Sequence, residues 1–373
     1  MARKSQASRT PATKGSSSKS GKGAGNKAVR GSGSLKEEAA PAPAPQLDPK
    51  IQQLLLDLFS RTFADELSAT DFEATLQTVK GALFNRDFAA AFSKEEHLAA
   101  YAARWSPTRA LCYASIFEGI RDHLEGLVAT TPMGGECGAE AESHEDEPQA
   151  APRLKMLSVG GGAAELAAFS ALLIGQRFTR GEAILADSGP WGSVVKKLHD
   201  VLTTHTIREI SKYTSHGENA DNGPAVSPES LLLRFSHSDV LATNKEQLSE
   251  LIGTEPLLIT ILFTLNELYT SGGIGKTTTF LLNLTSCAPI GTLLLVVDSP
   301  GSYSETGVGA QAKKYPMQWL LDHTLTKSLS DTWERLEAND SIWFRLADSL
   351  RYPIPLENMR YQLHLYRLVH SPT

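Results

Sequence analysis

The sequence predicts an α/β fold with a mostly parallel sheet, preceded by a small helical domain. Three observations support this prediction. Short apolar runs alternate with segments of helical spacing in residues 153–370, as in strands joined by crossover helices. The first of these runs ends in three consecutive glycines. The last two runs are joined by a proline-containing segment, which indicates an antiparallel hairpin at one edge of a seven-stranded sheet.

Residues 1–50 form a basic, low-complexity segment. Up to Lys36 there are nine Lys and Arg residues and no Asp or Glu, and an Ala-Pro stretch follows. Such a composition cannot bury enough apolar surface to fold, so we expect a disordered basic tail. It is either a nuclear or nucleolar address and RNA tether, or a solvated linker. The net charge of the whole chain is -6, so the folded part is acidic and must bind any nucleic acid through a local patch.

Residues 51–130 have apolar side chains at helical spacing, as in Ile51, Leu54 and Leu58, and are predicted to form several helices. Within them, the segment YAARWSPTRAL places Arg104 and Arg109 around a Trp-Ser-Pro turn. These arginines are candidate RNA contacts, because an indole can stack on a base and a guanidinium can hold a phosphate. The alternative is a packed tryptophan with two solvated arginines. Residues 131–152 are rich in glutamate and are expected to be an acidic flexible loop.

The three cysteines are far apart and lack the Cys/His spacing of a zinc site, so no metal is expected. The most apolar run, residues 257–265, is too short to cross a bilayer. We therefore expect no membrane partner.

Seven segments are candidate strands. They are residues 155–159, 183–187, 231–236, 257–265, 292–298, 342–346 and 361–369. After the first come Gly160, Gly161 and Gly162 and then a helical pattern, which is typical of a nucleotide-type cofactor site at a helix N-terminus. Glu165 stands where a dinucleotide fingerprint has its third glycine, which disfavours NAD and FAD. The spacing resembles the first motif of class I S-adenosylmethionine (SAM) methyltransferases, with Ser158 where an acid is common.

Two further strand ends carry candidate cofactor ligands. Asp187 ends the second strand, where a carboxylate can accept hydrogen bonds from both ribose hydroxyls. Asp239 and Val240 follow the third, where a polar group and an apolar wall would hold adenine. Each aspartate could instead cap a helix.

Asn266 and Glu267 follow the fourth strand, at the mouth of the predicted sheet. In a methyltransferase of this class, the substrate would meet the methyl group there. Asn266 could orient a base edge, and Glu267 could accept the proton of a weakly acidic ring N–H. Capping or surface roles are the alternative.

A competing motif follows in residues 271–278, SGGIGKTT, which resembles the deviant phosphate loop of ParA-type ATPases. In that alternative Lys276 would contact phosphates, Thr277 would bind Mg²⁺, and Asp298 would contact the metal through water. Against it, Ser271 replaces the lysine that defines the deviant loop.

Several separate blocks resemble one family, the fungal SAM-dependent methyltransferases that include the 25S rRNA uridine-N3 methyltransferases. The blocks are YAARWSPTRAL, LSVGGGAAE, LFTLNELYTSGGIGKTT, LLLVVDSPGSYSE, YPMQWLLDHTL, DSIWFRL and YPIPLENMRYQLHLYR, within residues 85–367. The resemblance implies a Rossmann-like SAM-binding fold and methylation of uridine N3 in large-subunit ribosomal RNA. It also implies a preribosome partner and residence in the nucleus and nucleolus.

For that reaction, Glu267 or Asp298 is the candidate acceptor of the uridine N3 proton. Tyr303 and Arg345 are candidates for gripping an extruded base. A third alternative is a ribosome-assembly factor with a catalytically degenerate methyltransferase fold, which the missing acid at Ser158 keeps open.

Overall fold

The computed structural model describes residues 47–129, 152–211, 222–301, 303–306 and 313–372. The predicted basic tail and acidic loop therefore lie almost entirely outside the described residues.

The main sheet has seven strands in the order β3-β2-β1-β4-β5-β9-β8. They are β1 Leu154–Val159, β2 Gly181–Asp187, β3 Leu231–His237, β4 Leu258–Leu262, β5 Leu293–Asp298, β8 Trp333–Phe344 and β9 Met359–Leu368. The first five pair in parallel, whereas β9 is antiparallel to both β5 and β8. The predicted α/β class, with a mostly parallel sheet ending in an antiparallel hairpin, is confirmed.

Both faces of the sheet are buried, because successive side chains of a strand point to opposite faces. In β1, Met156 belongs to one cluster of buried apolar residues, and the next residue, Leu157, belongs to the other. This explains why the central strands are continuous apolar runs in the sequence.

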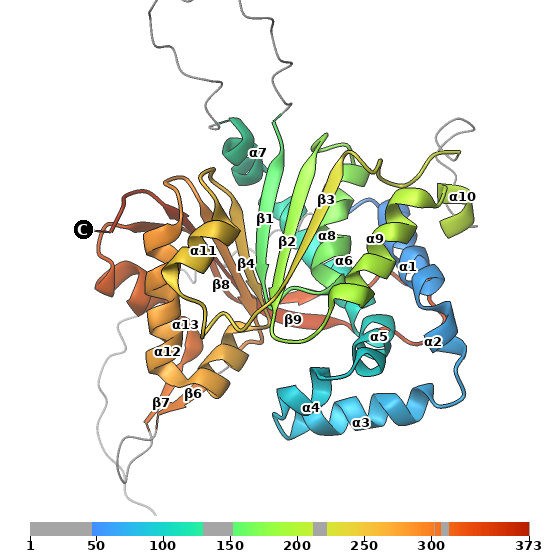
Figure 1. Cartoon of the computed structure of the whole chain (residues 1–373), viewed down its shortest axis with the longest axis horizontal. Helices are drawn as coiled ribbons and strands as arrows, with labels where there is room; N and C mark the ends of the chain where they lie inside the picture. The colour runs from blue at the N-terminus through green and yellow to red at the C-terminus, as the bar shows by residue number, and fades with distance from the viewer. Residues whose placement is uncertain (1–46, 130–151, 212–221, 302, 307–312, 373) are drawn as a thin grey trace, which may run out of the picture. The chain divides into compact units, whose positions relative to one another are not determined.

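Helices cover both faces (Figure 1). Before the sheet lie α1 Pro49–Thr62, α2 Ala64–Ser68, α3 Phe72–Phe84, α4 Phe88–Phe92, α5 Glu95–Arg104, α6 Ser106–Gly119 and α7 Arg121–Ala129. Between strands lie α8 Ala163–Ile174, α9 Gly192–Thr204, α10 Ile207–Ile210, α11 Lys245–Ile252, α12 Leu265–Cys287, α13 Met317–Asp322 and a π-helical turn, His323–Ser328. Helices α1, α6, α8 and α9 share one apolar cluster with the sheet, and α11, α12 and α13 share the other.

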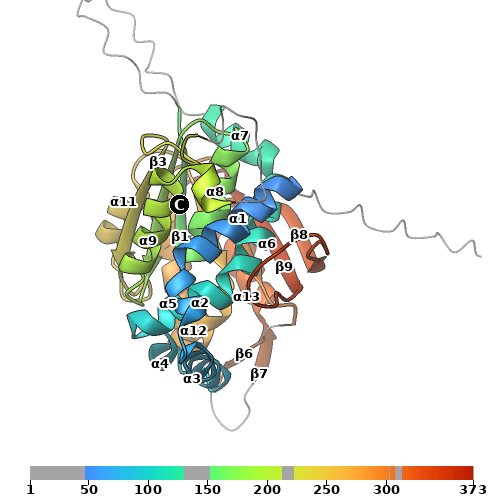
Figure 2. The ribbon, with the colours of Figure 1, turned by 90° about the vertical axis from the view of Figure 1, so that its right-hand side faces the viewer.

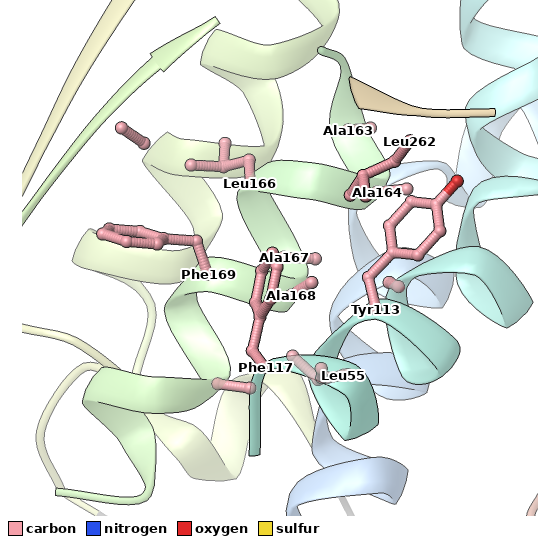
Figure 3. Packing of buried hydrophobic residues seen from close by; sticks show 14 of the residues in the cluster. Leu55, Tyr113, Phe117, Ala163, Ala164, Leu166, Ala167, Ala168, Phe169 and Leu262 are labelled. Atoms are coloured by element: carbon pink, nitrogen blue, oxygen red, sulfur yellow. The ribbon is translucent and has the colours of Figure 1, made fainter. Parts of the chain in front are cut away.

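Helix α6 is held against α8 by fully buried side chains. Tyr113 and Phe117 of α6 lie beside the small residues of α8, with Leu55 of α1 next to them (Figure 3). Alanines on α8 permit this close approach, since they leave room for the large rings of α6. The helices before the glycine turn therefore pack directly on the helix that follows it.

Two predicted strands have different limits in the structure. β4 ends at Leu262 instead of residue 265, because Phe263 has a left-handed φ of 57° and α12 begins at Leu265. β8 begins nine residues before the predicted start, at Trp333. It is an edge strand with mostly exposed polar side chains, so no apolar run marks it. A small second sheet of β6 Tyr303–Thr306 and β7 Lys313–Pro316 was not predicted.

Two helices and two short strands extend beyond the carboxyl ends of the parallel strands (Figures 1 and 2). Helices α3 and α4 lie at this end on one side, and β6 and β7 lie at the same end on the other, at the bottom of both views (Figures 1 and 2). In the parts of the chain that the structure describes, no helix is long and apolar enough to cross a membrane.

Candidate active site

The carboxyl ends of β1, β2 and β4 border a cavity of about 410 Å³. Its walls include Gly160, Gly162, Asp187, Arg109 and Glu267, which come from four separate parts of the chain. A second cavity of about 230 Å³ shares Gly160, Asp187 and Glu267 with the first and adds Asp239 and Val240. The fold thus brings most of the predicted site residues to one place.

The glycine turn forms the floor of this site. Gly160 has a φ of 72°, and a Cβ there would collide with the Thr264 side chain. A Cβ on Gly161 would come within 2.7 Å of the Ser158 side chain, and one on Gly162 within 3.2 Å of the Trp191 ring. The three glycines therefore leave a cradle that side chains would fill, and such a cradle fits a ligand lying against the backbone.

Ser158 lines neither of the two cavities. It is fully buried in β1, and its Oγ accepts a hydrogen bond of 2.9 Å from Thr260 Oγ1 of β4. The hydroxyl therefore links two strands inside the sheet.

Asp187 ends β2 at the junction of the two cavities. Its Oδ1 accepts a hydrogen bond of 2.6 Å from the Gly189 N–H. Burial raises the pKa of its carboxyl to about 6, although this hydrogen bond and His237 act in the opposite direction. Its other oxygen accepts no hydrogen bond from the described residues, and this oxygen and the position of Asp187 suit the predicted ribose contact.

Asp239 and Val240 line the smaller cavity after β3. Asp239 Oδ1 accepts a hydrogen bond of 2.9 Å from the Leu241 N–H, and Val240 is buried. The predicted pair of a polar group and an apolar wall is thus present, although the aspartate also has the capping role that the sequence left open.

Glu267 is in the first turn of α12. It is half-buried and lines both cavities. Burial raises the pKa of its carboxyl to about 7, Arg109 opposes this shift, and Asp187 and Asp298 add to it. A carboxyl with this pKa exchanges a proton readily near neutral pH.

Asn266 and Asp298 are placed differently from Glu267. Neither residue lines the two cavities. Asp298 ends β5, is 3% exposed, and accepts hydrogen bonds from the backbone N–H groups of Asn266 and Ser299, at 3.1 Å and 2.7 Å. Asp298 thus ties the end of β5 to the first turn of α12, which carries Glu267.

The predicted substrate contacts with described side chains have different surroundings in the structure. Arg109 lines the larger cavity, whereas Arg104 forms an ion pair of 2.6 Å with Glu357, away from the cavity walls. Arg345 lies after β8, its Cζ 5.3 Å from the ring centroid of the exposed Trp343. Tyr303 begins β6, and its side chain lies outside the described part of the structure.

Several cavity residues were not predicted as site residues. Glu165 and Tyr101 line the larger cavity, as do three aromatic residues, Phe88, Phe92 and Trp191. Glu165 carried a usable signal, because it occupies the position of a third glycine. The aromatic residues carried none, since their spacing is that of ordinary core residues.

Within the described ranges, no group of three or more His, Cys, Asp or Glu residues is arranged to hold a metal ion.

The ATPase alternative is wrong. A phosphate loop must lie between a strand and its helix, but residues 271–278 lie inside α12, which starts at Leu265. Only Gly273 in this helix departs from helical dihedral angles, with φ 72° and ψ 172°. The motif therefore produces a kink in a helix and no phosphate loop.

Two solved structures were found to be similar to part of this chain, both at low identity and low TM-score. A SAM-dependent methyltransferase from Clostridium acetobutylicum has 10% identity and a TM-score of 0.30, with 58% of this chain and 84% of that chain covered. The 16S rRNA (adenine(1408)-N(1))-methyltransferase from Catenulisporales acidiphilia has 11% identity and a TM-score of 0.35, with 58% and 89% covered.

Sequence similarity is stronger. The chain is 33% identical over 348 residues to the 25S rRNA (uridine(2843)-N(3))-methyltransferase of Saccharomyces cerevisiae, which covers 84% of this chain and 85% of that protein. Residues 59–367 match the model of a family described as "Putative SAM-dependent methyltransferase". The chain belongs to this family and is a SAM-dependent methyltransferase.

Proposed function

We propose that this enzyme methylates N3 of a uridine in large-subunit ribosomal RNA. The proposal is supported by the yeast relative, whose name states this reaction. The observation that carries it is Glu267, a half-buried carboxyl in a cavity beside the glycine turn, with a pKa raised to about 7 by burial. Uridine N3 is largely protonated at neutral pH, so its methylation requires a proton acceptor, and Glu267 suits that task.

The cofactor is proposed to lie across the two cavities. Gly160, Gly161 and Gly162 would support it from below, and Asp187 would accept hydrogen bonds from the ribose hydroxyls. Asp239 and Val240 would hold the adenine in the smaller cavity. When bound, SAM supplies a methyl group on a sulfonium sulfur, and the electron pair of the broken C–S bond stays on that sulfur.

Glu267 would receive the N3 proton while the N3 electron pair forms the new bond to carbon. Asp298 and Asn266 would act as positioning residues, since Asp298 holds the backbone of the turn that carries Glu267. This arrangement fixes the acceptor on a rigid element, which favours alignment of the reacting atoms.

The uridine must leave its base pair to react, because N3 lies on the pairing edge. Arg345 and Tyr303 remain proposed RNA contacts. Arg104 remains one at the helical side, although it is paired with Glu357. We also propose a nuclear, nucleolar enzyme that acts on a preribosome, with the basic segment of residues 1–50 as its address or RNA tether.

Methylation of purified large-subunit rRNA with methyl-labelled SAM tests this function. We expect label in 3-methyluridine at one position, which mass spectrometry of nuclease fragments would locate. Label at another base, or on a uridine atom other than N3, would contradict the proposal. Binding of preribosomal RNA without any methyl transfer would instead support the degenerate assembly factor.

A further inference from the structure

The larger cavity holds a cation that makes no close ion pair with any of the described residues. Arg109 of α6 lies between two aromatic rings, with its Cζ 5.5 Å from the centroid of Tyr101 and 5.1 Å from that of Phe263. Among the described residues, the Arg109 guanidinium makes no ion pair within 4.0 Å and no hydrogen bond. A half-buried guanidinium without such partners is costly unless a ligand supplies an anion.

A carboxylate lines the same cavity. Glu165 in the first turn of α8 is 5% exposed, and its Oε2 accepts a hydrogen bond of 2.8 Å from the Gly162 N–H. Burial raises its pKa to about 7, although this hydrogen bond and Arg109 lower it. The cavity thus offers one positive and one negative side chain beside the glycine cradle.

We propose that Arg109 and Glu165 bind the amino-acid end of SAM, with the guanidinium on the α-carboxylate and the Glu165 carboxylate on the α-ammonium. This proposal rests on the proposed placement of the cofactor. It assigns Arg109 to the cofactor and replaces the RNA contact that the sequence suggested.

The order of groups along the two cavities supports this orientation. Asp187 lies in both cavities, and Asp239 and Val240 lie only in the smaller one. Arg109 and Glu165 lie only in the larger one. With ribose at Asp187 and adenine at Val240, the amino-acid end of the cofactor must extend into the larger cavity. A zwitterion is the part of SAM that this pair of opposite charges complements.

Glu165 also accounts for the serine at the end of β1. Ser158, which stands where related methyltransferases commonly have an acid, is bonded to Thr260 inside the sheet. It cannot contribute a charge to the cavity. Glu165, seven residues after Ser158, lines the cavity with a carboxylate that comes from helix α8 and not from strand β1.

The inference gives the helices before the sheet a role in cofactor binding. Arg109 comes from α6, and one of its two flanking rings, Tyr101, comes from α5. Both helices precede the glycine turn. The cofactor site is therefore incomplete without α5 and α6, so these helices contribute to cofactor binding and not only to RNA binding.

Calorimetric titration with SAM and with decarboxylated SAM tests the Arg109 contact, because the second ligand lacks only the α-carboxylate. The full-length protein should bind SAM about 10- to 100-fold more tightly than decarboxylated SAM, which is the range for a charge-assisted hydrogen bond. Arg109→Met should bind SAM correspondingly more weakly and should no longer discriminate between the two ligands. Arg177 pairs with Glu118 at 3.1 Å and lines neither cavity, so the matched control Arg177→Met should bind both ligands as the unchanged protein does.

Glu165→Gln tests the second contact. It should weaken both ligands to a similar degree, because both carry the ammonium, and should leave the affinity for 5′-methylthioadenosine, which lacks the whole amino-acid end, within about twofold. Retained binding of 5′-methylthioadenosine also shows that each variant is folded.

Three outcomes would overturn the inference. The first is equal affinity of the unchanged protein for SAM and decarboxylated SAM. The second is an Arg109→Met variant that keeps its SAM affinity and loses RNA binding. The third is equal weakening of SAM and 5′-methylthioadenosine in either variant. If the unchanged protein binds none of the three ligands, the proposed cofactor placement itself fails, which is a different result.

Discussion

The molecule presents charged side chains in two regions at the same end of the sheet, and their surroundings differ. In the cavity, Glu165, Asp187 and Glu267 are fully or half-buried, and burial raises all three pKa values, to between about 6 and about 7. At the edge formed by β8 and β9, Arg345 and Arg360 lie 5.3 Å and 5.7 Å from the ring of Trp343, which is 53% exposed. The cavity contains groups that can change protonation state, and the edge contains permanent charges in water.

This difference indicates separate functions, catalysis in the cavity and attraction of RNA at the edge. Chemistry needs groups whose pKa is close to the working pH, and desolvation provides this. Attraction of a polyanion needs charge that stays constant and accessible. We therefore expect cavity substitutions to alter catalysis by large factors, and edge substitutions to alter RNA affinity by small ones.

Removing the proton acceptor should have the largest effect. Glu267→Gln keeps the size of the side chain but cannot accept a proton, so the methylation rate should fall by about 100- to 10,000-fold. Single-turnover methylation at saturating SAM measures this rate. SAM affinity should change little, because Glu267 is not a proposed cofactor ligand.

Glu334→Gln, an exposed carboxylate on β8, is the matched control for this substitution. A loss of rate of the same size in the control, or an unchanged rate in Glu267→Gln, would remove Glu267 from the mechanism.

The packing of α6 on α8 allows a second comparison of buried and exposed positions. Phe117 is fully buried between these helices, and Phe84 at the end of α3 is 87% exposed. Phe117→Ala should lower the free energy of unfolding by about 3–5 kcal/mol, and Phe84→Ala should change it by less than about 0.5 kcal/mol. Denaturant unfolding measures both. Similar losses in the two variants would show that α6 is not docked as the structure has it.

The arrangement of the sheet could be predicted because its signals are local. Each buried strand is a short apolar run, and the glycine turn, Asp187 and Asp239 all lie at or just after the ends of such runs. Since the carboxyl ends of parallel strands meet at one edge, their convergence follows from the alternation of strands and helices. The edge strand β8 was predicted too short, because exposure on one side removes the apolar pattern from which strands are recognised.

The rest of the site could not be predicted because it depends on tertiary packing. Arg104 and Arg109 belong to one eleven-residue block, yet the structure places Arg109 in the cavity and Arg104 in an ion pair with Glu357, 253 residues away. No local pattern separates the two. The division into a helical domain and a methyltransferase domain stays a prediction, although the helices share one apolar cluster with the sheet.

The pH dependence of the rate sharpens the contrast between the two regions. The pKa of Glu267 is about 7, and only its ionised form accepts a proton. At saturating SAM, the methylation rate should therefore rise about tenfold per pH unit well below pH 7 and level off above it. The residual rate of Glu267→Gln should lack this step. A rate of the unchanged enzyme that is flat between about pH 5 and about pH 8 would contradict the assignment.

The smallest effect is expected at the edge. Arg345 is exposed and lies over the exposed ring of Trp343, so Arg345→Ala should leave stability and SAM affinity unchanged. If the edge binds phosphate, the variant should lose RNA affinity by a few-fold for all sequences, and the slope of log affinity against log salt should decrease by about 1. Arg335 lies on the same strand at its opposite end, paired with Asp322 at 3.0 Å, and Arg335→Ala is the matched control. Of the two arginines, Arg345 is nearer to the carboxyl ends of the parallel strands. Equal losses of RNA affinity in both variants would mean a diffuse electrostatic attraction. A loss of RNA affinity confined to Arg345→Ala would mean that RNA binds at the end of β8 that is nearer to the cavity.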